Sequence, residues 1–242
     1  MNIKAFFKRI YDRYFHETKW KCGLCGKELF DGNYLCESCL KKLPFNDKNI
    51  CNHCGRQTIY PEDYCLTCKN ILVSIDVGRS VFLYEGKIRK LIVNFKHRNQ
   101  RYLSELFGKF LYDKYCECKF NPDFITFVPM SDKRLKKRGF NQTELLAKNL
   151  SERSGKDVLP IFSKVSETKR QAKLSYAERI KNLRGSFKVT DKKAVRGKSV
   201  LIVDDVTTTG ATGEILAALL KKAGAKTVTV LTIASVKKKE GY

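Results

Sequence analysis

The stretch Val200–Thr212, with the sequence VLIVDDVTTTGAT, constrains the fold more than any other part of this chain. Its first four residues are all apolar, which is typical of a strand buried on both faces of a parallel sheet. Two adjacent carboxylates, Asp204 and Asp205, follow the strand, and a threonine-rich loop leads into a helix predicted at about residues 213–223. The pattern predicts a strand–loop–helix junction at the ligand-binding edge of an α/β domain.

This junction has the composition of a phosphate site beside a site for hydroxyl groups. Main-chain N–H groups at a helix N-terminus favour an anion, and Gly210 lets the main chain approach it closely. Two carboxylates would repel a phosphate, but they suit sugar hydroxyls or a Mg2+ ion beside it. A sugar phosphate with free vicinal hydroxyls therefore fits. The predicted binding residues are Asp204, Asp205, Val206, Thr207, Thr208, Thr209, Gly210, Ala211 and Thr212.

Eight of the ten cysteines form an internal repeat in residues 22–68. Each copy holds two Cys-x2-Cys pairs separated by ten residues, and the second copy is offset from the first by 29 residues. This spacing is typical of closed, structural zinc sites, so we expect two Zn2+ ions without a catalytic role. The spacing leaves sequential and interleaved ligand pairing open. The predicted ligands are Cys22, Cys25, Cys36, Cys39, Cys51, Cys54, Cys65 and Cys68.

The net charge of +23 is concentrated in the part of the chain that carries the phosphate loop. Residues 1–80 hold 13 Lys+Arg and 9 Asp+Glu, whereas residues 81–242 hold 35 and 16. Such a cationic surface attracts polyanions, nucleic acid first and anionic lipid second, with a merely solvated surface as the alternative. No secretory signal or membrane-spanning apolar run is visible, which predicts a cytoplasmic protein. Cysteines in that compartment favour metal or free thiols over disulfides, and Cys116 and Cys118 are interpreted as ordinary thiols.

Composition divides the chain into three predicted parts. Residues 1–18 contain an amphipathic helix, at residues 3–15, that packs on this protein or, alternatively, lies on the inner face of the membrane. Residues 19–75 form the double zinc module, and residues 76–242 form an α/β domain with a parallel sheet and helices on both faces. Strands are expected at about residues 77–84, 124–129, 200–204 and 227–235, and helices at about 87–96, 103–115 and 140–153. Asn141 is the expected cap of the last of these helices, and Gly224 is expected to end the helix after the phosphate loop.

Three basic clusters accompany the phosphate loop. The first contains Lys96, and the second contains Arg134 and Arg138 shortly after a strand, where guanidinium groups would hold pyrophosphate. The third contains Gln171 and Arg179 within residues 164–198, which carry 12 basic and 3 acidic residues and suit a mobile loop closing over an anion. A solvated basic face is the alternative for each cluster. Aromatic residues among the clusters are candidates for stacking on bases, namely Phe140, Tyr176 and Phe187.

These motifs, in this order, resemble the ComF family of competence-associated proteins over nearly the whole chain. The motifs that carry the resemblance are Tyr84-x-Gly86-x2-Arg89 with Lys96, Arg138-Gly139-Phe140-Asn141-Gln142, Gln171 to Phe187, and the loop Asp204–Thr212. The last of them is similar to the ribose-5-phosphate signature of type I phosphoribosyltransferases. Two departures are the paired zinc module, where some members carry a single four-cysteine knuckle, and Lys96-His97-Arg98-Asn99, where a glycine near the lysine is commoner.

The resemblance implies a role in natural transformation, the uptake of single-stranded DNA. The preferred hypothesis is a protein that binds phosphoribosyl pyrophosphate or a related sugar phosphate together with single-stranded DNA. A DNA-translocating competence motor is a further candidate partner, reached through the zinc module. The alternative is an active phosphoribosyltransferase that uses phosphoribosyl pyrophosphate and Mg2+ to glycosylate a nucleobase or another acceptor. In that reaction Arg134 and Arg138 would stabilise the leaving pyrophosphate, but no nucleobase pocket is recognisable in the sequence.

Overall fold

A computed structural model describes residues 21–29, 34–59, 63–69, 73–97, 100–166 and 176–237. The chain forms two compact units, Met1–Leu43 and Pro44–Tyr242. The helix predicted at residues 3–15 lies outside the described residues. The described part of the first unit contains a short helix, α2 (Glu37–Leu40), and an antiparallel bridge between Lys21 and Glu28. No helix in the described part of the chain combines the length and apolarity needed to cross a membrane.

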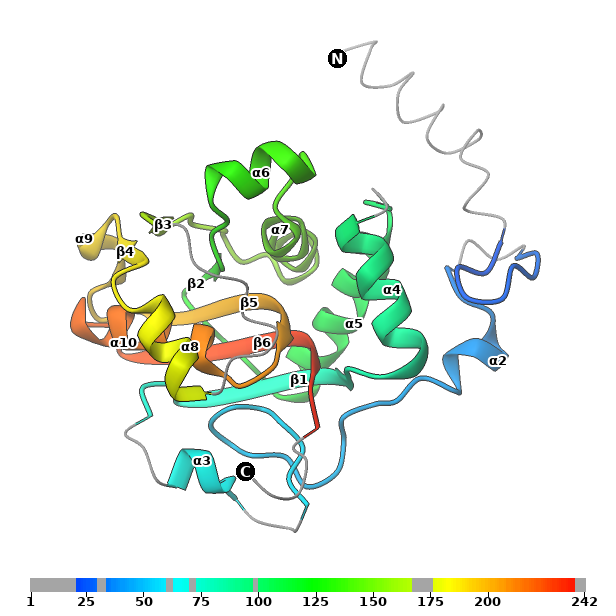
Figure 1. The fold of residues 1–242 in the computed structure, drawn as a ribbon, viewed down its shortest axis with the longest axis horizontal. Helices are drawn as coiled ribbons and strands as arrows, with labels where there is room; N and C mark the ends of the chain where they lie inside the picture. The colour runs from blue at the N-terminus through cyan, green and yellow to red at the C-terminus, as the bar shows by residue number, and fades with distance from the viewer. Residues whose placement is uncertain are drawn as a thin grey trace. The chain divides into compact units, whose positions relative to one another are not determined.

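The second unit is built around a parallel four-stranded sheet (Figure 1). Its strands lie in the order β1 (Val77–Leu83), β6 (Thr227–Ser235), β5 (Ser199–Thr207) and β2 (Phe124–Phe127). All three pairings are parallel, as predicted. The four apolar residues at the start of the phosphate motif lie in β5 and are at most 1% exposed, because helices cover both faces of this strand.

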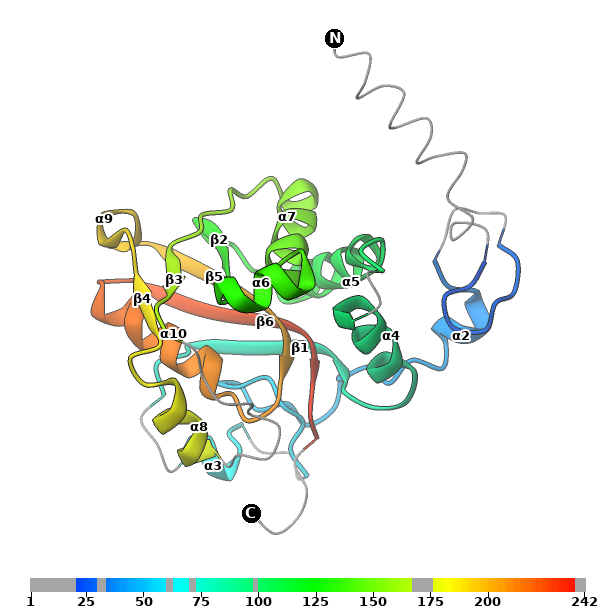
Figure 2. The same cartoon turned by 45° about the horizontal axis from the view of Figure 1, so that its top comes forward.

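Helices pack on both faces of the sheet, which confirms the predicted architecture (Figure 2). On one face, α5 (Leu103–Glu117) contacts β1 and β6, and α7 (Gln142–Ser154) contacts β2 and β5. The helix α4 (Gly86–His97) packs against α5 on the same side. On the other face, α10 (Ala211–Lys222) packs against β5, β6 and the short helix α8 (Tyr176–Leu183).

The main differences from prediction at the phosphate motif concern its boundaries. Because β5 stays paired with β6 as far as Thr207, both carboxylates belong to the strand and the loop is shorter than expected. The helix α10 begins at Ala211 rather than near residue 213, after Gly210 at φ +87°, in the left-handed region that favours glycine. The predicted cap of α7 is confirmed, since the Asn141 side chain accepts a hydrogen bond from the Thr143 N–H at 3.2 Å. Gly224 follows α10 at φ +92°, as predicted.

Residues 164–198 are not the continuous loop that the sequence predicted. The strand β3 (Phe162–Lys164) pairs with β4 (Phe187–Val189) as an antiparallel ribbon, α8 precedes β4, and α9 (Lys192–Val195) precedes β5. Residues 167–175 lie outside the described part of this segment. A further helix, α6 (Asp132–Arg138), contains the basic cluster after β2 and has no buried residue, so no apolar periodicity marks it in the sequence.

The second half of the cysteine repeat lies in the larger unit, with α3 (Leu66–Lys69) carrying its last cysteine. The first turn of this second half, which contains Asn52 and Gly55, is fixed to β1 through main-chain and side-chain hydrogen bonds. The Gly55 carbonyl accepts from Asn46 Nδ2 at 2.8 Å and from Ser80 Oγ at 3.0 Å, and the Gly78 N–H donates to the Asn52 carbonyl at 2.9 Å. These contacts cover the β1 edge of the sheet and hold the turn beside the loop that starts α10.

Candidate sugar-phosphate site

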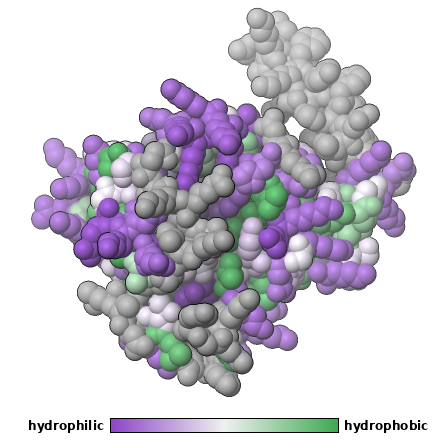
Figure 3. All heavy atoms as spheres, viewed as in Figure 1, coloured by the Kyte–Doolittle hydropathy of each residue, from purple (hydrophilic) through white to green (hydrophobic). Residues whose placement is uncertain are grey.

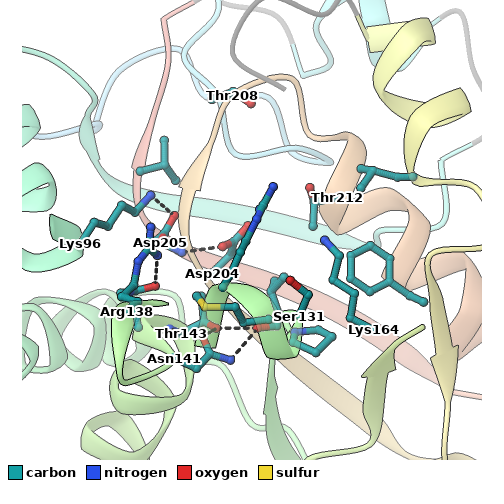
Figure 4. A pocket seen from close by; sticks show the side chains of 18 of the residues that line it. Lys96, Ser131, Arg138, Asn141, Thr143, Lys164, Asp204, Asp205, Thr208 and Thr212 are labelled. Atoms are coloured by element: carbon teal, nitrogen blue, oxygen red, sulfur yellow. Dashed lines mark hydrogen bonds and ion pairs between the residues drawn. The ribbon is translucent and has the colours of Figure 1, made fainter. Parts of the chain in front are cut away.

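A cavity of about 670 Å³ opens where the carboxyl ends of β2 and β5 meet the loops that follow them (Figure 4). Parallel sheets bind ligands at this edge, because loops and helix N-termini converge there. The cavity is lined from the β5–α10 junction, from the segment after β2, from α4, and from α8 with the β3–β4 ribbon. The lining residues are Tyr84, Arg89, Lys96, Val128, Pro129, Met130, Ser131, Arg134, Arg138, Asn141, Gln142, Thr143, Lys164, Arg179, Leu183, Phe187, Asp204, Asp205, Val206, Thr208, Thr212 and Val236.

The two carboxylates of the phosphate motif occupy different electrostatic environments. Asp205 forms an ion pair with Lys96, with 2.7 Å between Oδ1 and Nζ, and both side chains are largely buried. Asp204 accepts a hydrogen bond from the Asp205 N–H at 2.7 Å. Burial and the neighbouring Asp205 charge raise the pKa of Asp204 to about 7, although that hydrogen bond and Lys96 oppose the shift. Asp204 is therefore a carboxyl group that changes its charge near neutral pH.

Two arginines hold the loop after β5, and both donate hydrogen bonds to Thr208. Arg179 of α8 donates from Nη1 to the Thr208 hydroxyl at 2.6 Å, and Arg56 donates from Nη1 to the Thr208 carbonyl at 3.3 Å. Beyond this residue, the first N–H groups of α10 have no partners within the helix. Such N–H groups can bind a phosphate, and the adjacent Thr212 side chain also faces the cavity (Figure 4).

The predicted residues of the phosphate motif do not all face the cavity. Five of them line it, namely Asp204, Asp205, Val206, Thr208 and Thr212. Thr209 and Gly210 instead line a much smaller cavity next to the second cysteine group, and Thr207 and Ala211 are buried. The motif residues therefore face different sides, because β5 continues to Thr207 and α10 starts at Ala211.

The predicted anion-binding residues converge on the same cavity from separate elements. Lys96 comes from the last turn of α4, and Arg134 and Arg138 come from α6. Arg138 bonds to the Gln142 side chain, and burial places the pKa of its guanidinium below the usual range, with repulsion from Arg134 adding to the shift and Asp205 opposing it. A guanidinium that has lost water in this way favours an anionic ligand. Arg179 also lines the cavity, whereas Gln171 lies outside the described residues.

Two further residues, Lys164 and Arg56, contribute to the site although no sequence pattern predicted them. Lys164 reaches the cavity because the β3–β4 ribbon pairs it with Phe187, and a pairing between strands of three residues leaves little signal in the sequence. Arg56 lies two residues after Cys54, at the end of a Cys-x2-Cys pair. Its contact with the loop joins residues 152 positions apart, so local patterns could not reveal it.

Two of the three aromatic residues proposed for base stacking are not exposed for that purpose. Phe140 is 7% exposed, packs against Phe95 with ring centroids 5.9 Å apart, and is covered by the Arg101 guanidinium. Phe187 is 5% exposed and lies under the Lys164 ammonium, 5.0 Å from its ring centre. The stacking prediction is therefore wrong for both residues, and the side chain of Tyr176 lies outside the described residues.

The eight repeated cysteines form two separate four-thiol groups, which settles the pairing as sequential. Within each group, all four Sγ atoms lie within 4.8 Å of one another. The Cys25–Cys36 and Cys54–Cys65 Sγ atoms are 3.7 and 3.8 Å apart, which matches a tetrahedron with Zn–S bonds of about 2.3 Å and not a disulfide bond of about 2.05 Å. The groups fit structural zinc, and their closed geometry leaves no open position for catalysis. In the described part of the chain, Cys116 and Cys118 belong to no such group.

Comparison with known proteins identifies both parts of the chain. A double zinc ribbon domain matches residues 19–72, and a phosphoribosyl transferase domain matches residues 130–242. Competence protein F of Haemophilus influenzae is 30% identical over 209 residues, covering 84% of this chain and 90% of the relative. DNA utilization protein YhgH of Escherichia coli is 29% identical over 219 residues, covering 86% and 94%. Competence protein ComFC of Bacillus subtilis is 26% identical over 210 residues, covering 82% and 83%.

These matches span both the zinc-binding repeat and the sheet that carries the cavity. They agree with the resemblance seen in the sequence motifs, and they cover most of this chain and most of each relative. With its double zinc ribbon and its phosphoribosyltransferase-like domain, the chain belongs to the ComF family of competence proteins.

Proposed function

We propose that this protein acts in competence by binding phosphoribosyl pyrophosphate, or a related sugar phosphate, in the cavity and single-stranded DNA on the basic surface beside it. The observation that carries the proposal is the composition of the cavity. A helix N-terminus, two adjacent carboxylates and several cationic side chains line one volume of about 670 Å³. The relatives named for competence and DNA utilization support the cellular role.

The groups in the cavity suit the different parts of such a ligand. The N–H groups of α10 and the Thr212 hydroxyl bind the sugar phosphate, and the carboxylates of Asp204 and Asp205 accept hydrogen bonds from ribose hydroxyls. Arg134 and Arg138 bind the pyrophosphate from α6. Mg2+ would enter with the pyrophosphate and neutralise part of its charge, and carboxylate and phosphate oxygens are the ligands that this ion prefers. Lys96 keeps Asp205 in place before the ligand arrives.

An active phosphoribosyltransferase is the second candidate, favoured by the apolar wall of the same cavity. Val128, Pro129 and Met130 are half-buried and line it together with the carboxylates, so a planar acceptor could pack beside the ribose. The preferred function needs binding only, whereas this one needs turnover. Release of pyrophosphate from phosphoribosyl pyrophosphate in the presence of a panel of nucleobases distinguishes them.

The pyrophosphate contacts can be tested by comparing two ligands. Changing either Arg134 or Arg138 to glutamine should weaken phosphoribosyl pyrophosphate binding between about 10- and 100-fold, because one charge-assisted hydrogen bond contributes about 1.5–3 kcal/mol. Ribose 5-phosphate lacks the pyrophosphate, so its affinity should not change. Isothermal titration calorimetry with both ligands measures the difference. Equal loss for the two ligands would show that the arginines act elsewhere than at the pyrophosphate.

The DNA contact is expected at α6, where hydrophilic side chains gather in Figure 3. Lys133, Lys136 and Lys137 are exposed on this helix, one side of which borders the cavity. Changing all three to alanine should weaken binding of a single-stranded oligonucleotide and reduce the slope of log K against log salt by about 2, at about 0.7 per lost phosphate contact.

A matched control for this test lies on another part of the same unit. Lys192, Lys193 and Arg196 are equally basic and exposed, at or just after α9. Their replacement with alanine changes the net charge by the same amount. Because these residues lie outside the proposed contact at α6, it should alter DNA affinity much less. Fluorescence anisotropy across a salt series measures both triple variants. Equal losses would mean that net charge, and not a site at α6, attracts the DNA.

A further inference from the structure

The second four-cysteine group lies directly against the loop that begins α10. A small cavity between them is lined by Cys54 and Cys68 on one side and by Thr209 and Gly210 on the other. A Cβ atom added to Gly210 would lie only 3.6 Å from the Cys54 Cβ atom. The zinc-binding turn and the predicted phosphate loop therefore pack as neighbours within the unit Pro44–Tyr242.

Arg56 connects these two neighbours with one buried guanidinium group. Its side chain donates from Nε to Cys54 Sγ at 3.5 Å and from Nη2 to Cys65 Sγ at 3.7 Å. Its third contact is the bond from Nη1 to the Thr208 carbonyl at 3.3 Å. Arg56 is only 7% exposed, and no carboxylate among the described residues forms an ion pair with it.

Zinc thiolate chemistry explains why a positive charge is stable in this position. A Zn2+ ion bound by four thiolates carries a net charge of about −2, since each ligand must lose its proton. A buried arginine needs such an opposite charge nearby, because desolvation without a partner is costly. The zinc-bound thiolates thus fix the guanidinium, and the guanidinium in turn fixes the main chain at Thr208.

The turn that carries Arg56 is itself held firmly. Asn46 and Ser80 donate to the Gly55 carbonyl, one residue before Arg56, and Ser80 also bonds to Ser235 of β6 with 2.8 Å between the two hydroxyl oxygens. On its other side, the Thr208 hydroxyl accepts from Arg179. The loop is therefore held between a fixed arginine from the zinc turn and an arginine from α8.

We propose that Arg56 is a positioning residue for the loop at residues 208–210, the sugar-phosphate loop, and that the second zinc site anchors Arg56 there. This inference rests on the proposed function, since it concerns the same loop. The first half of the repeat provides an internal comparison. Lys27 stands where Arg56 stands in the second half, but it is exposed and belongs to the unit Met1–Leu43. The two zinc groups therefore differ in role although their ligand spacing is the same.

The experiment compares Arg56→Gln with Lys27→Gln in the full-length zinc-loaded protein. For Arg56→Gln we expect faster hydrogen exchange in peptides covering residues 207–213 without ligand, and about tenfold weaker binding of phosphoribosyl pyrophosphate with Mg2+. We expect Arg56→Lys to show the same loss to a smaller degree, because an ammonium group cannot reach all three acceptors in the guanidinium geometry. Native mass spectrometry should still find two zinc ions in these variants, and Lys27→Gln should match the wild type in every measurement.

A second variant tests the anchor itself. Cys65→Ser removes one thiolate contact of Arg56, and it should lower the zinc content and accelerate exchange at residues 207–213 in the same way as Arg56→Gln. If Arg56→Gln leaves both exchange and affinity unchanged, the inference is wrong while the proposed function stands. If the wild type does not bind the ligand at all, the proposed function fails, and hydrogen exchange still decides whether Arg56 positions the loop.

Discussion

Changing Asp204 and Asp205 together to asparagine should weaken phosphoribosyl pyrophosphate binding by about 100-fold or more. A hydrogen bond to a charged group contributes about 1.5–3 kcal/mol, and the double change replaces both charged acceptors by amides of the same shape. It also removes the ion partner of Lys96, which then loses its position in the cavity. Isothermal titration calorimetry of the folded double variant measures the loss.

The control for this change is an aspartate at the amino ends of the strands, opposite the carboxyl ends where the cavity lies. Asp123 precedes β2, accepts a hydrogen bond from the Ser199 N–H at 2.7 Å and pairs with Lys198. Asp123→Asn therefore removes a carboxylate with similar partners but far from the cavity, and it should leave the affinity unchanged. A double variant that binds the ligand as tightly as the wild type would contradict the assignment of the ribose hydroxyls to this pair.

The raised pKa of Asp204, about 7, gives this prediction a pH dependence. An ionised carboxylate accepts hydrogen bonds from hydroxyl groups better than a protonated one, so affinity should rise as pH increases through about 7. A sugar phosphate itself titrates near pH 6, and Asp204→Asn shows that contribution alone. The difference between wild type and variant should therefore be small at pH 5.5 and large at pH 8.

The contribution of Asp204 to protein stability should have the opposite pH dependence to its contribution to ligand affinity. The folded-state pKa lies above the ordinary value of 3.8, so the folded protein binds more protons than the unfolded chain between these two values. The contribution of Asp204 to the free energy of unfolding therefore falls as pH rises from 3.8 to about 7, and stays low above that. Urea unfolding of Asp204→Asn should show a gain over the wild type at pH 8 that shrinks at pH 5. A gain that does not vary with pH would contradict the shifted pKa.

The second large effect is expected from Gly78→Ala, at the contact between β1 and the second zinc turn. A Cβ atom at this position would overlap the His53 carbonyl oxygen, and it would lie 2.7 Å from the Cys54 carbonyl carbon and 2.8 Å from the Gly55 nitrogen. All three neighbours are main-chain atoms, so the clash can be relieved only by moving the turn away from the strand. We expect a loss of about 3 kcal/mol or more in the free energy of unfolding, at the upper end of overpacking effects.

Gly213→Ala is the matched control for this substitution. It lies in α10, where an added Cβ atom would be 3.4 Å from the Ile75 Cδ1 atom and would meet only side chains. Alanine also favours a helix over glycine by about 1 kcal/mol, so stability should stay the same or rise. Chemical denaturation and zinc content should be measured for both variants. A Gly78→Ala protein with wild-type stability would show that the zinc turn does not pack against β1 as described.

The parts of the fold that the sequence predicted are those with strong local patterns. The apolar start of β5, the β-branched run of β6 and the cap at Asn141 each identify their element without reference to the rest of the chain. The cysteine repeat predicted two four-thiol groups for the same reason, because its spacing has few other physical interpretations. Order along the chain then placed the acidic pair at the carboxyl edge of a parallel sheet.

The parts that the sequence did not predict depend on distant contacts or on surface helices. The helix α6 buries no residue, so its charged sequence shows no apolar face to distinguish it from a loop. The β3–β4 ribbon pairs strands of three residues across an intervening helix and includes the buried Phe187. Phe140 is buried through its contact with Phe95, which is distant in the sequence. The same limit applies to the bond between Arg56 and Thr208 and to the raised pKa of Asp204, since both arise only after the chain has folded.

The pairing of β1 with β6 has a consequence for the order in which the protein assembles. Val77 pairs with Thr229, and the neighbouring bond from the Val228 N–H to Asp76 spans 152 positions. At about 5–20 residues per second, a ribosome needs roughly 8–30 s to synthesise that interval. All ligands of the second zinc group precede Asp76, so they are synthesised before this interval begins. The group can therefore take up its metal while the sheet against which it packs is still incomplete. Nascent chains stalled after β1 should then already retain zinc, and the sugar-phosphate loop should acquire its shape only when β6 has emerged.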